Sequence, residues 1–246
     1  MGNTVKNHLK RKIPQLVTFK QHLSALAYKS QIFWHEIKPS SAAQVFHKKF
    51  TTNSWAGKDS FSGHGSDFVQ TETLRQELPA ILRELNINSL LDAPCGDFYW
   101  MNLINLDLEK YVGIDIVPDL IWRNQQKYGS EFRKFLDADI TQDNLPKSDM
   151  VLCRDCLVHL SFRDIKLAIQ QFKQSHSSYL LTTTYPSLLS ENKNIVTGDW
   201  RPIDLEKPPF NFPAPIRIIH EKSAIISDLK EKSLGLWRLE DLQIGQ

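Results

Sequence analysis

The stretch LLDAPCGD, residues 90–97, is a short apolar run that ends in an acid and continues into a turn with one glycine. A run of this kind is typical of a parallel strand that is buried on both faces. Open α/β sheets bind their ligands beyond the carboxyl ends of the strands, and a glycine lets the backbone approach a ligand closely. The stretch therefore predicts the first strand of an α/β domain and one wall of a ligand site.

Short apolar runs alternate with helical patterns on the carboxyl-terminal side of this stretch. They predict strands over residues 89–93, 111–116, 135–140, 150–153 and 179–183, and helices over 121–134 and 161–174. Such alternation indicates βαβ units, and right-handed crossovers then give a doubly wound parallel sheet. Helical spacing also runs over 67–86, where Pro79 is expected to kink or divide it.

The end of the chain has a different pattern. Five prolines fall within residues 202–215, so this tail is expected to be irregular. Runs over 216–220 and 234–239 predict two further strands, with no long helix required between them. Together these expectations give a seven-stranded, mainly parallel sheet that ends in an antiparallel hairpin.

The net charge of +2 hides a division of the chain. Residues 1–50 carry nine Lys and Arg against one acid, whereas the remaining residues carry 21 against 27 acids. We expect a basic helical extension over 1–50 and one domain over 51–246. The extension has four interpretations: a solvated helical cap, a weak contact with an anionic membrane surface, a nucleic-acid contact or a dimer contact. Because basic charge alone is not a motif, no stable nucleic-acid partner is predicted, and the oligomeric state stays open.

Composition excludes several classes of protein. Hydrophobic residues make up 41% and charged residues 24% of the chain, which is ordinary for a soluble globular protein. No apolar run approaches the roughly 20 residues of a membrane helix, and the first residues lack the apolar segment of a signal peptide. Three cysteines cannot all pair with one another, so a reducing compartment and a cytoplasmic location are expected.

Acids stand at the ends of the first three predicted strands. Asp92 ends the first strand, Asp115 ends the second, and Asp139 follows the third in the sequence DADI. A carboxylate at the end of the second strand can accept hydrogen bonds from both hydroxyls of a ribose, and one after the third can meet an adenine amino group. The order of the acids predicts an adenosine-containing ligand, although each acid alone could merely cap a helix or face water.

These residues carry a resemblance to a known family. The ordered motifs LLDAPCGD, GIDI, DADI and DMVLCRD, over about residues 88–185, resemble those of the Rossmann-like class I S-adenosylmethionine-dependent methyltransferases. The resemblance implies S-adenosylmethionine as cofactor, with Asp92 near its methionine amino group, Asp115 on its ribose and Asp139 on its adenine. Further cofactor-binding residues are expected at Pro94, Cys95, Gly96, Asp97, Ile116, Ile140 and Arg154.

The glycine loop departs from the usual family pattern. Pro94 and Phe98 stand where the outer glycines of the family would be, and Gly96 alone remains. DAPCGD resembles a subset of the family that is associated with glycan and surface-polysaccharide assembly. The W-x-G-x-x-S-x-S-G-x-G-S pattern at 55–66 and the NFP and LWRLEDL segments resemble the same subset. A nicotinamide dehydrogenase would instead show G-x-G-x-x-G after the first strand.

Candidate catalytic residues follow the fourth predicted strand. A sugar hydroxyl is a weak nucleophile that needs a base; Asp155 and His159 are the candidates, and histidine titrates near neutrality. Two alternatives stay open: an ion pair of Asp155 with Arg154, and a His159 that only packs before a helix. The absence here of Asn/Asp-Pro-Pro-Tyr argues against methylation of nucleic-acid amines. The pair Cys153-x-x-Cys156 is interpreted as packing, and no metal is predicted.

Substrate contacts are expected from two segments beside this site, the loop at 60–66 and the chain after the fifth strand. Aromatic faces there could stack on the C–H face of a sugar while polar neighbours bind its hydroxyls. The alternatives are a plain connector at 60–66 and a Pro-rich tail that packs its aromatics into the core. The expected contacts are His64, Tyr185, Asp199, Trp200, Arg201, Phe210 and Phe212.

The sequence thus predicts an S-adenosylmethionine-dependent O-methyltransferase that acts on a sugar hydroxyl of a glycan or nucleotide-sugar. Methylation of a small metabolite, a protein or an RNA would use the same cofactor site. A non-catalytic S-adenosylmethionine-binding module would also share the fold.

Overall fold

The computed structural model describes residues 41–55, 57–186, 190–221 and 232–243. Residues 1–40 of the basic helical extension expected over 1–50 lie outside this part of the chain. The chain divides into Met1–Pro39 and a compact unit Ser40–Gln246. The helix α2 (Ala42–Thr51) lies in this unit, although its sequence position suggested the basic extension. None of the described helices is long and apolar enough to span a membrane.

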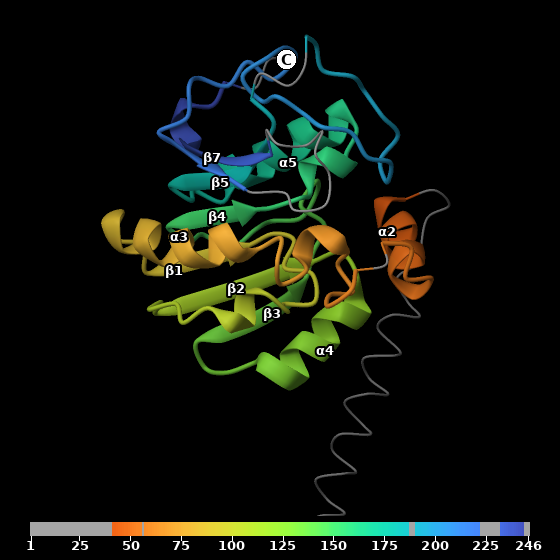
Figure 1. Ribbon diagram of the computed structural model, residues 1–246, viewed down its shortest axis with the longest axis vertical. Coiled ribbons are helices and arrows are strands. Elements are labelled where there is room, and N and C mark those ends of the chain that lie inside the picture. Colours follow the sequence, from red (N-terminus) through yellow and green to blue (C-terminus); the bar gives the residue numbers. More distant parts are fainter. Residues whose placement is uncertain (1–40, 56, 187–189, 222–231, 244–246) are drawn as a thin grey trace, which may run out of the picture. The chain divides into compact units, whose positions relative to one another are not determined.

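The sheet has seven strands in the order β3-β2-β1-β4-β5-β7-β6 (Figure 1). Strands β1 to β5 pair in parallel, and β7 pairs antiparallel with both β5 and β6. This confirms the predicted doubly wound sheet with a late antiparallel hairpin. The strands are β1 (Ser89–Asp92), β2 (Lys110–Asp115), β3 (Arg133–Asp137), β4 (Met150–Cys153), β5 (Tyr179–Thr184), β6 (Arg217–His220) and β7 (Ser233–Arg238).

The helices begin and end where local chemistry places them. α4 (Pro118–Tyr128) starts and stops earlier than predicted, because Pro118 occupies its first turn and the chain enters β3 at Arg133. α5 (Phe162–Gln174) begins at the predicted cap, where the Ser161 Oγ accepts a hydrogen bond from the Asp164 backbone N–H at 3.1 Å. α3 (Glu72–Glu84) accommodates Pro79 inside one helix.

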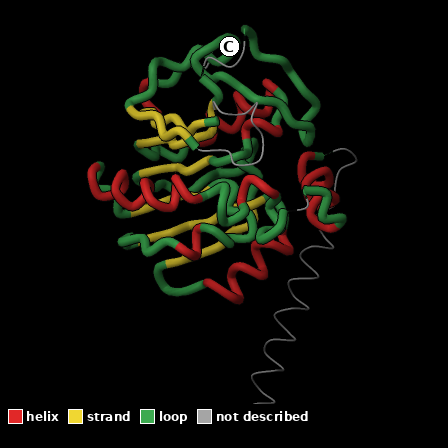
Figure 2. Tube along the Cα trace, in the orientation of Figure 1, coloured by secondary structure: helices red, strands yellow, loops and turns green. Residues whose placement is uncertain are grey.

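Helices, red in Figure 2, lie against the yellow strands of the sheet. Alternating residues of the strands build two apolar layers, one on each face of the sheet. Leu90 and Met150 pack with Leu78 and Ile81 of α3, whereas Leu91 packs on the other face. The second layer includes Ile165, Ala168, Ile169 and Phe172 of α5. This is the period-two pattern of a sheet that is covered on both faces.

The strand order reverses direction between β1 and β4. From β1 the chain steps outward through β2 and β3, and from β4 it steps to the other side through β5. Loops that leave β1 and β4 therefore diverge, and a crevice opens between them at the carboxyl edge of the sheet. This edge carries the site described next.

Helix α2 is attached to the edge of this crevice. Its Ser41 cap accepts a hydrogen bond from the backbone N–H of Gln44, and His47 Nε2 lies 3.3 Å from the Asp119 carboxylate of α4. Phe50 packs with Val117 and Leu120. The helix is therefore part of the folded unit that bears the site.

Candidate active site

A cavity of about 620 Å³ lies at the carboxyl ends of the strands. Every residue that the sequence assigned to the cofactor lines it, as do both candidate catalytic residues. The set is Asp92, Pro94, Cys95, Gly96, Asp97, Asp115, Ile116, Asp139, Ile140, Arg154, Asp155 and His159. The structure thus brings residues from the ends of β1, β2, β3 and β4 to one place.

Asp115, at the end of β2, is oriented by two backbone donors. The Gly96 N–H donates to its Oδ2 at 3.1 Å and the Val117 N–H to its Oδ1 at 3.0 Å. Each oxygen keeps one acceptor position, so the carboxylate can still bind two neighbouring hydroxyls. Burial raises the pKa of Asp115 to about 6, against the lowering effect of these N–H donors.

Asp92 is buried at the end of β1 and accepts a hydrogen bond from the Tyr111 hydroxyl at 2.5 Å. Burial raises the pKa of Asp92 to about 7, and the Tyr111 hydroxyl opposes the increase. A cation beside this carboxylate would favour its ionised form. Asp92 is therefore suited to receive an ammonium group.

Asp139 lines the cavity but uses most of its carboxylate within its own turn. Its Oδ1 accepts from the Thr141 N–H and hydroxyl, at 2.8 and 2.7 Å, and its Oδ2 accepts from Gln142 Nε2 at 2.9 Å. One of roughly four acceptor positions remains. That position could meet one amino group, as the sequence predicted.

The segment Ser60–Ser66, called the strap below, closes over the loop after β1. The Ser60 hydroxyl donates to both oxygens of Asp97, at 2.9 and 3.0 Å, and the Phe61 N–H donates at 2.8 Å. In return the Asp97 N–H donates to the Ser62 Oγ at 2.9 Å. Asp97 thus lines the cavity mainly as the attachment of the strap.

The same Ser62 explains the glycine in the loop after β1. Gly96 has φ +53°, and a Cβ there would lie 2.2 Å from the Ser62 Oγ. Only glycine fits between the strap and the first strand end. The sequence predicted that the backbone at Gly96 lies close to another group. That group is Ser62 of the strap.

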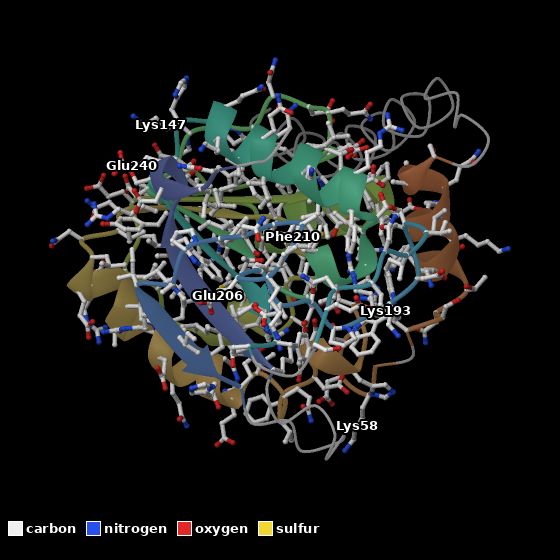
Figure 3. All side chains as sticks on the ribbon, turned by 90° about the horizontal axis from the view of Figure 1, so that it is seen from above. Lys58, Lys147, Lys193, Glu206, Phe210 and Glu240 are labelled. Atoms are coloured by element: carbon white, nitrogen blue, oxygen red, sulfur yellow. The ribbon has the colours of Figure 1, made fainter. Side chains whose placement is uncertain are left out.

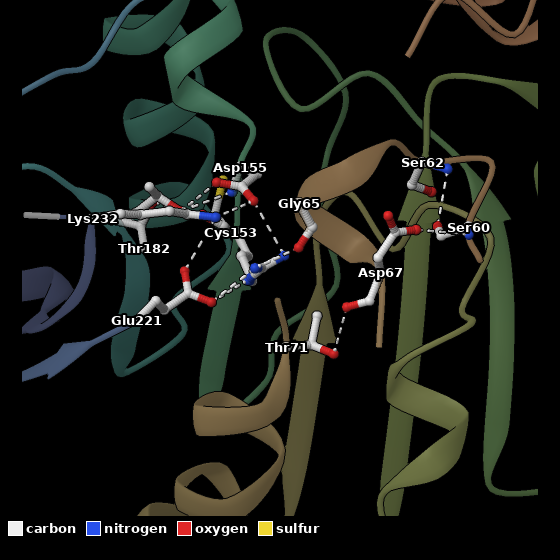
Figure 4. Close-up of polar contacts among 12 residues, drawn as sticks. Ser60, Ser62, Gly65, Asp67, Thr71, Cys153, Asp155, Thr182, Glu221 and Lys232 are labelled. Atoms are coloured by element: carbon white, nitrogen blue, oxygen red, sulfur yellow. Dashed lines mark hydrogen bonds and ion pairs between the residues drawn. The ribbon is translucent and has the colours of Figure 1, made fainter. Parts of the chain in front are cut away.

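At its other end the strap meets a cluster of four charged side chains, Arg154, Asp155, Glu221 and Lys232 (Figure 4). Arg154 donates to the Gly65 carbonyl at 2.7 Å and pairs with Glu221 at 2.8 Å and Asp155 at 3.2 Å. Lys232 pairs with Asp155 at 2.6 Å and Glu221 at 3.3 Å. The ion pair of Arg154 with Asp155, which the sequence left open as the alternative to a catalytic Asp155, is present.

This cluster changes the expected role of Asp155. Burial alone would raise its pKa, but Lys232 and Arg154 outweigh burial and hold the pKa well below its usual range. A carboxylate this acidic is a poor proton acceptor at neutral pH. Asp155 is therefore a structural anion, and the candidate base is His159.

His159 is held in one tautomer by the backbone. Its Nδ1 lies 2.8 Å from the Asp199 carbonyl oxygen, which can only accept a hydrogen bond, so Nδ1 carries the proton. Burial lowers the pKa of His159 below its usual 6.5. The imidazole is therefore neutral at pH 7 with a lone pair on Nε2, as a general base requires.

Three of the seven predicted substrate residues line the cavity, namely His64, Tyr185 and Trp200. The Tyr185 and Trp200 rings meet edge to face at 6.4 Å. The His64 Nδ1 lies 3.2 Å from the buried Asp67 carboxylate. These three stay candidates for acceptor binding.

The other four predicted residues do not line this cavity. Asp199 acts through its backbone carbonyl on His159. Arg201 is buried and donates to the carbonyls of Leu157 and Leu160, at 2.8 and 2.7 Å. Phe210, which Figure 3 labels, and Phe212 are buried. Their rings pack edge to face on Phe162 and Trp237. The Pro-rich tail thus packs its aromatics into the core.

Part of the cavity wall was not expected from the sequence, in the amino-terminal segment and directly before β7. Ala42 and Phe46 of α2, Trp55 and Lys232 also line the cavity. The W-x-G pattern at residue 55 was a signal for Trp55, but nothing in the local sequence indicated Phe46 or Lys232. Among the described residues no three His, Cys, Asp or Glu side chains gather as a metal site would require.

No protein-family model and no curated protein matches the chain. Solved structures with a similar fold do exist. The N-methyltransferase NodS from Bradyrhizobium japonicum WM9, in complex with S-adenosyl-L-homocysteine, is 12% identical, with a TM-score of 0.55 over 78% of this chain and 97% of that chain.

Two further structures give the same result. Magnesium protoporphyrin IX methyltransferase from Synechocystis PCC 6803, with bound S-adenosylmethionine, is 16% identical, with a TM-score of 0.53 over 82% of this chain and 98% of that one. The methyltransferase domain of bacterial CtHen1 is 12% identical, with a TM-score of 0.51 over 68% and 97%. The chain therefore has the fold of these methyltransferases.

Proposed function

We propose that the protein is an S-adenosylmethionine-dependent O-methyltransferase whose acceptor is a sugar hydroxyl. The observation that carries the proposal is the convergence of Asp92, Asp115 and Asp139 on the cavity that also contains the neutral His159. The methyltransferase fold of the chain supports it.

The cavity fits the proposed cofactor. About 620 Å³ lies within the usual range for small-molecule sites. The free acceptor positions of Asp115 suit two ribose hydroxyls, and the buried Asp92 suits an ammonium group. Asp139 keeps one acceptor for an amino group. When bound, the cofactor would supply an electrophilic methyl group.

The chain's own part in the chemistry is to hold the acceptor and remove its proton. With Nδ1 engaged by Asp199, Nε2 of His159 can take the proton of a hydroxyl as the new bond forms. The charged cluster holds Asp155, whose φ is +51°, in place beside His159 and leaves the imidazole as the base. An acceptor hydroxyl needs such a base, whereas a carboxylate or thiol acceptor needs it less.

The sugar as acceptor class is supported by the composition of the wall. Trp55, Tyr185 and Trp200 offer aromatic faces, and His64 and Lys232 offer polar groups in the same cavity. Apolar ring faces next to hydroxyl partners suit a pyranose. The resemblance of the DAPCGD motif to a glycan-associated subset points to the same class.

Calorimetric titration of the purified protein with S-adenosylmethionine and S-adenosylhomocysteine tests the cofactor. We expect both to bind, Asp115→Ala to abolish binding, and Asp107→Ala, an exposed acid outside the cavity wall, to bind as wild type. Failure of the wild-type protein to bind either compound would contradict the proposal.

The acceptor class needs a second measurement. Transfer of a radiolabelled methyl group is followed into the glycan and the protein fractions of a host extract. We expect label in glycans that resists mild alkali, since ethers survive where methyl esters do not. Label in protein alone would exclude the sugar hydroxyl.

A further inference from the structure

We propose that Trp55 is the platform on which the acceptor ring stacks, and that the acceptor is a hexopyranose whose reacting hydroxyl points to the neighbouring His159. This inference rests on the proposed function, because it locates the acceptor half of the same cavity. Trp55 takes the stacking role that the sequence assigned to Phe210 and Phe212, because both of these side chains are buried in the core.

The position of Trp55 next to the base is the first observation. Trp55 and His159 both line the cavity, with ring centroids 6.2 Å apart and planes tilted by 55°. A base must reach the reacting hydroxyl within hydrogen-bonding distance. An acceptor ring whose hydroxyl reaches His159 therefore also lies next to the Trp55 indole.

Contacts within the protein fix the Trp55 indole in place. Phe46 of α2 stacks on Trp55 with centroids 6.1 Å apart and planes 27° apart, and the Lys49 ammonium lies 6.0 Å from its centroid. A Cβ on Gly63, which has φ +98°, would lie 3.0 Å from the Trp55 Cβ, so the strap packs tightly against it. A side chain fixed in this way binds a ring with little loss of conformational entropy.

Helix α2, which carries Phe46, is attached to both sides of the site. His47 contacts Asp119 on α4. Val45 packs so closely on Gly198 that a Cβ there would lie 2.3 Å from the Val45 Cγ1. Gly198 directly precedes Asp199, whose carbonyl orients His159. Platform and base are thus held by the same piece of structure.

The other groups on the cavity wall favour a sugar over a flat aromatic acceptor. Trp200 is 46% exposed and lines the same cavity, but His64, Ser62 and Lys232 line it as well. A pyranose presents an apolar C–H face to an indole and hydroxyls to such polar groups at its rim. These groups already have partners in the protein, but Lys232, whose ammonium has three N–H donors and two anionic partners, keeps one donor that a sugar hydroxyl could use and a planar aromatic compound could not.

Saturation-transfer difference NMR with methyl hexopyranosides of the gluco, galacto, manno, fuco and rhamno series tests the inference. The full chain is used with S-adenosylhomocysteine present. We expect saturation concentrated on the C–H protons of one sugar face. Trp55→Ala should weaken pyranoside binding about tenfold, Trp55→Phe should restore most of it, and Phe46→Ala should have an intermediate effect.

A matched control and a second readout separate the possible failures. Trp122→Phe changes a tryptophan of α4 that does not line the cavity and should bind pyranosides as wild type. Calorimetry should give an unchanged S-adenosylhomocysteine affinity for Trp55→Ala, which also shows that the variant folds.

Wild-type pyranoside binding by Trp55→Ala with the cofactor bound would overturn this inference and leave the methyltransferase proposal intact. Binding of catechol with no binding of any pyranoside would overturn it too. If S-adenosylhomocysteine fails to bind the wild-type chain, the proposed function itself fails.

Discussion

The Lys232 ammonium lies 2.6 Å from the Asp155 carboxylate, across 77 residues of sequence. Arg154 lies on the same carboxylate at 3.2 Å, and Glu221 completes the cluster with 2% of its side chain exposed. Two cations and two anions balance, so the cluster adds no net charge to the cavity. We therefore expect a substitution in this cluster to change the stability of the fold more than it changes proton transfer.

Asp155→Asn should lower the free energy of unfolding by about 3 kcal/mol, because it leaves Arg154 and Lys232 without one of their two anions. Urea denaturation measures the change. The pH dependence of any remaining activity should keep its wild-type shape, since Asp155 is not the titrating base. A double variant, Asp155→Asn with Lys232→Met, should lose less than the sum of the single changes. A variant of wild-type stability with no activity would return Asp155 to the role of base.

His159→Gln should lower kcat about 10²–10⁴-fold with unchanged affinity for S-adenosylhomocysteine, because it removes only the proton acceptor. In the wild-type protein kcat should rise with pH through a pKa below 6.5 and then level off, since burial disfavours the charged imidazole. Single-turnover rates between pH 5 and 8 provide the measurement. His220→Gln, on β6, is the control and should keep the wild-type profile. If kcat still rises with pH in His159→Gln, another residue is the base.

Tyr111→Phe should shift the pH dependence of cofactor binding upward. The Tyr111 hydroxyl donates to Asp92 and opposes the effect of burial that raises the pKa of Asp92 to about 7. Without this donor the Asp92 pKa rises further, and the carboxylate that would receive an ammonium group forms only at higher pH. Calorimetry from pH 6 to 9 should show weakened binding at pH 7 that recovers at pH 9. Tyr179→Phe, outside the cavity, should leave the curve unchanged.

The same raised pKa values affect the stability of the ligand-free protein. Asp92 and Asp115 bind protons more tightly folded than unfolded, since their pKa values of about 7 and about 6 exceed the ordinary 3.8. Their contribution to stability is therefore fully present below pH 3.8 and is lost as the pH rises from there through the raised pKa values. Asp115→Asn should flatten the decline of Tm between about pH 4 and 6, the interval between the ordinary pKa of 3.8 and the raised pKa of Asp115. An equally steep decline in that variant would argue against the buried carboxyl as its source.

Arg201→Met should destabilise the fold without changing the KM for the acceptor. The guanidinium donates to the backbone carbonyls of Leu157, Leu160 and Lys193, and the variant leaves these acceptors without their donor. The loss of charge-assisted hydrogen bonds should cost about 3 kcal/mol in a denaturant titration. Arg217→Met breaks an exposed pair with Glu84 and should change the unfolding free energy by less than about 1 kcal/mol. A raised acceptor KM for Arg201→Met at full stability would restore its predicted place in the substrate site.

The parts of the site that follow from strand periodicity could be predicted. Asp92, Asp115 and Asp139 were located because buried strands are recognisable and their ends meet at one edge of the sheet. The charge on His159 and the role of Asp155 could not be predicted, because both depend on groups far away in sequence. Lys232 and the Asp199 carbonyl approach them only after the chain has folded.

The aromatic residues show the same limit. A Pro-rich segment with Phe210 and Phe212 resembles a substrate wall, but Phe162 and Trp237 provide a core for them to fill. Phe46 lies in a basic stretch whose sequence predicts a helical extension of open purpose. Its contact with Trp55 turns one face of that helix into a wall of the cavity.

The origin of the cavity walls has a consequence for how such a chain can diversify. The three strand-end carboxylates and His159 belong to the central sheet and its loops, whereas Phe46 and Trp55 come from a short segment that precedes all seven strands. Replacement of residues 41–55 would alter the acceptor wall and leave the hydrogen-bonded architecture of the sheet unchanged. Selection for a new acceptor could therefore act on this one continuous segment, while the sheet and the residues at its strand ends stay the same.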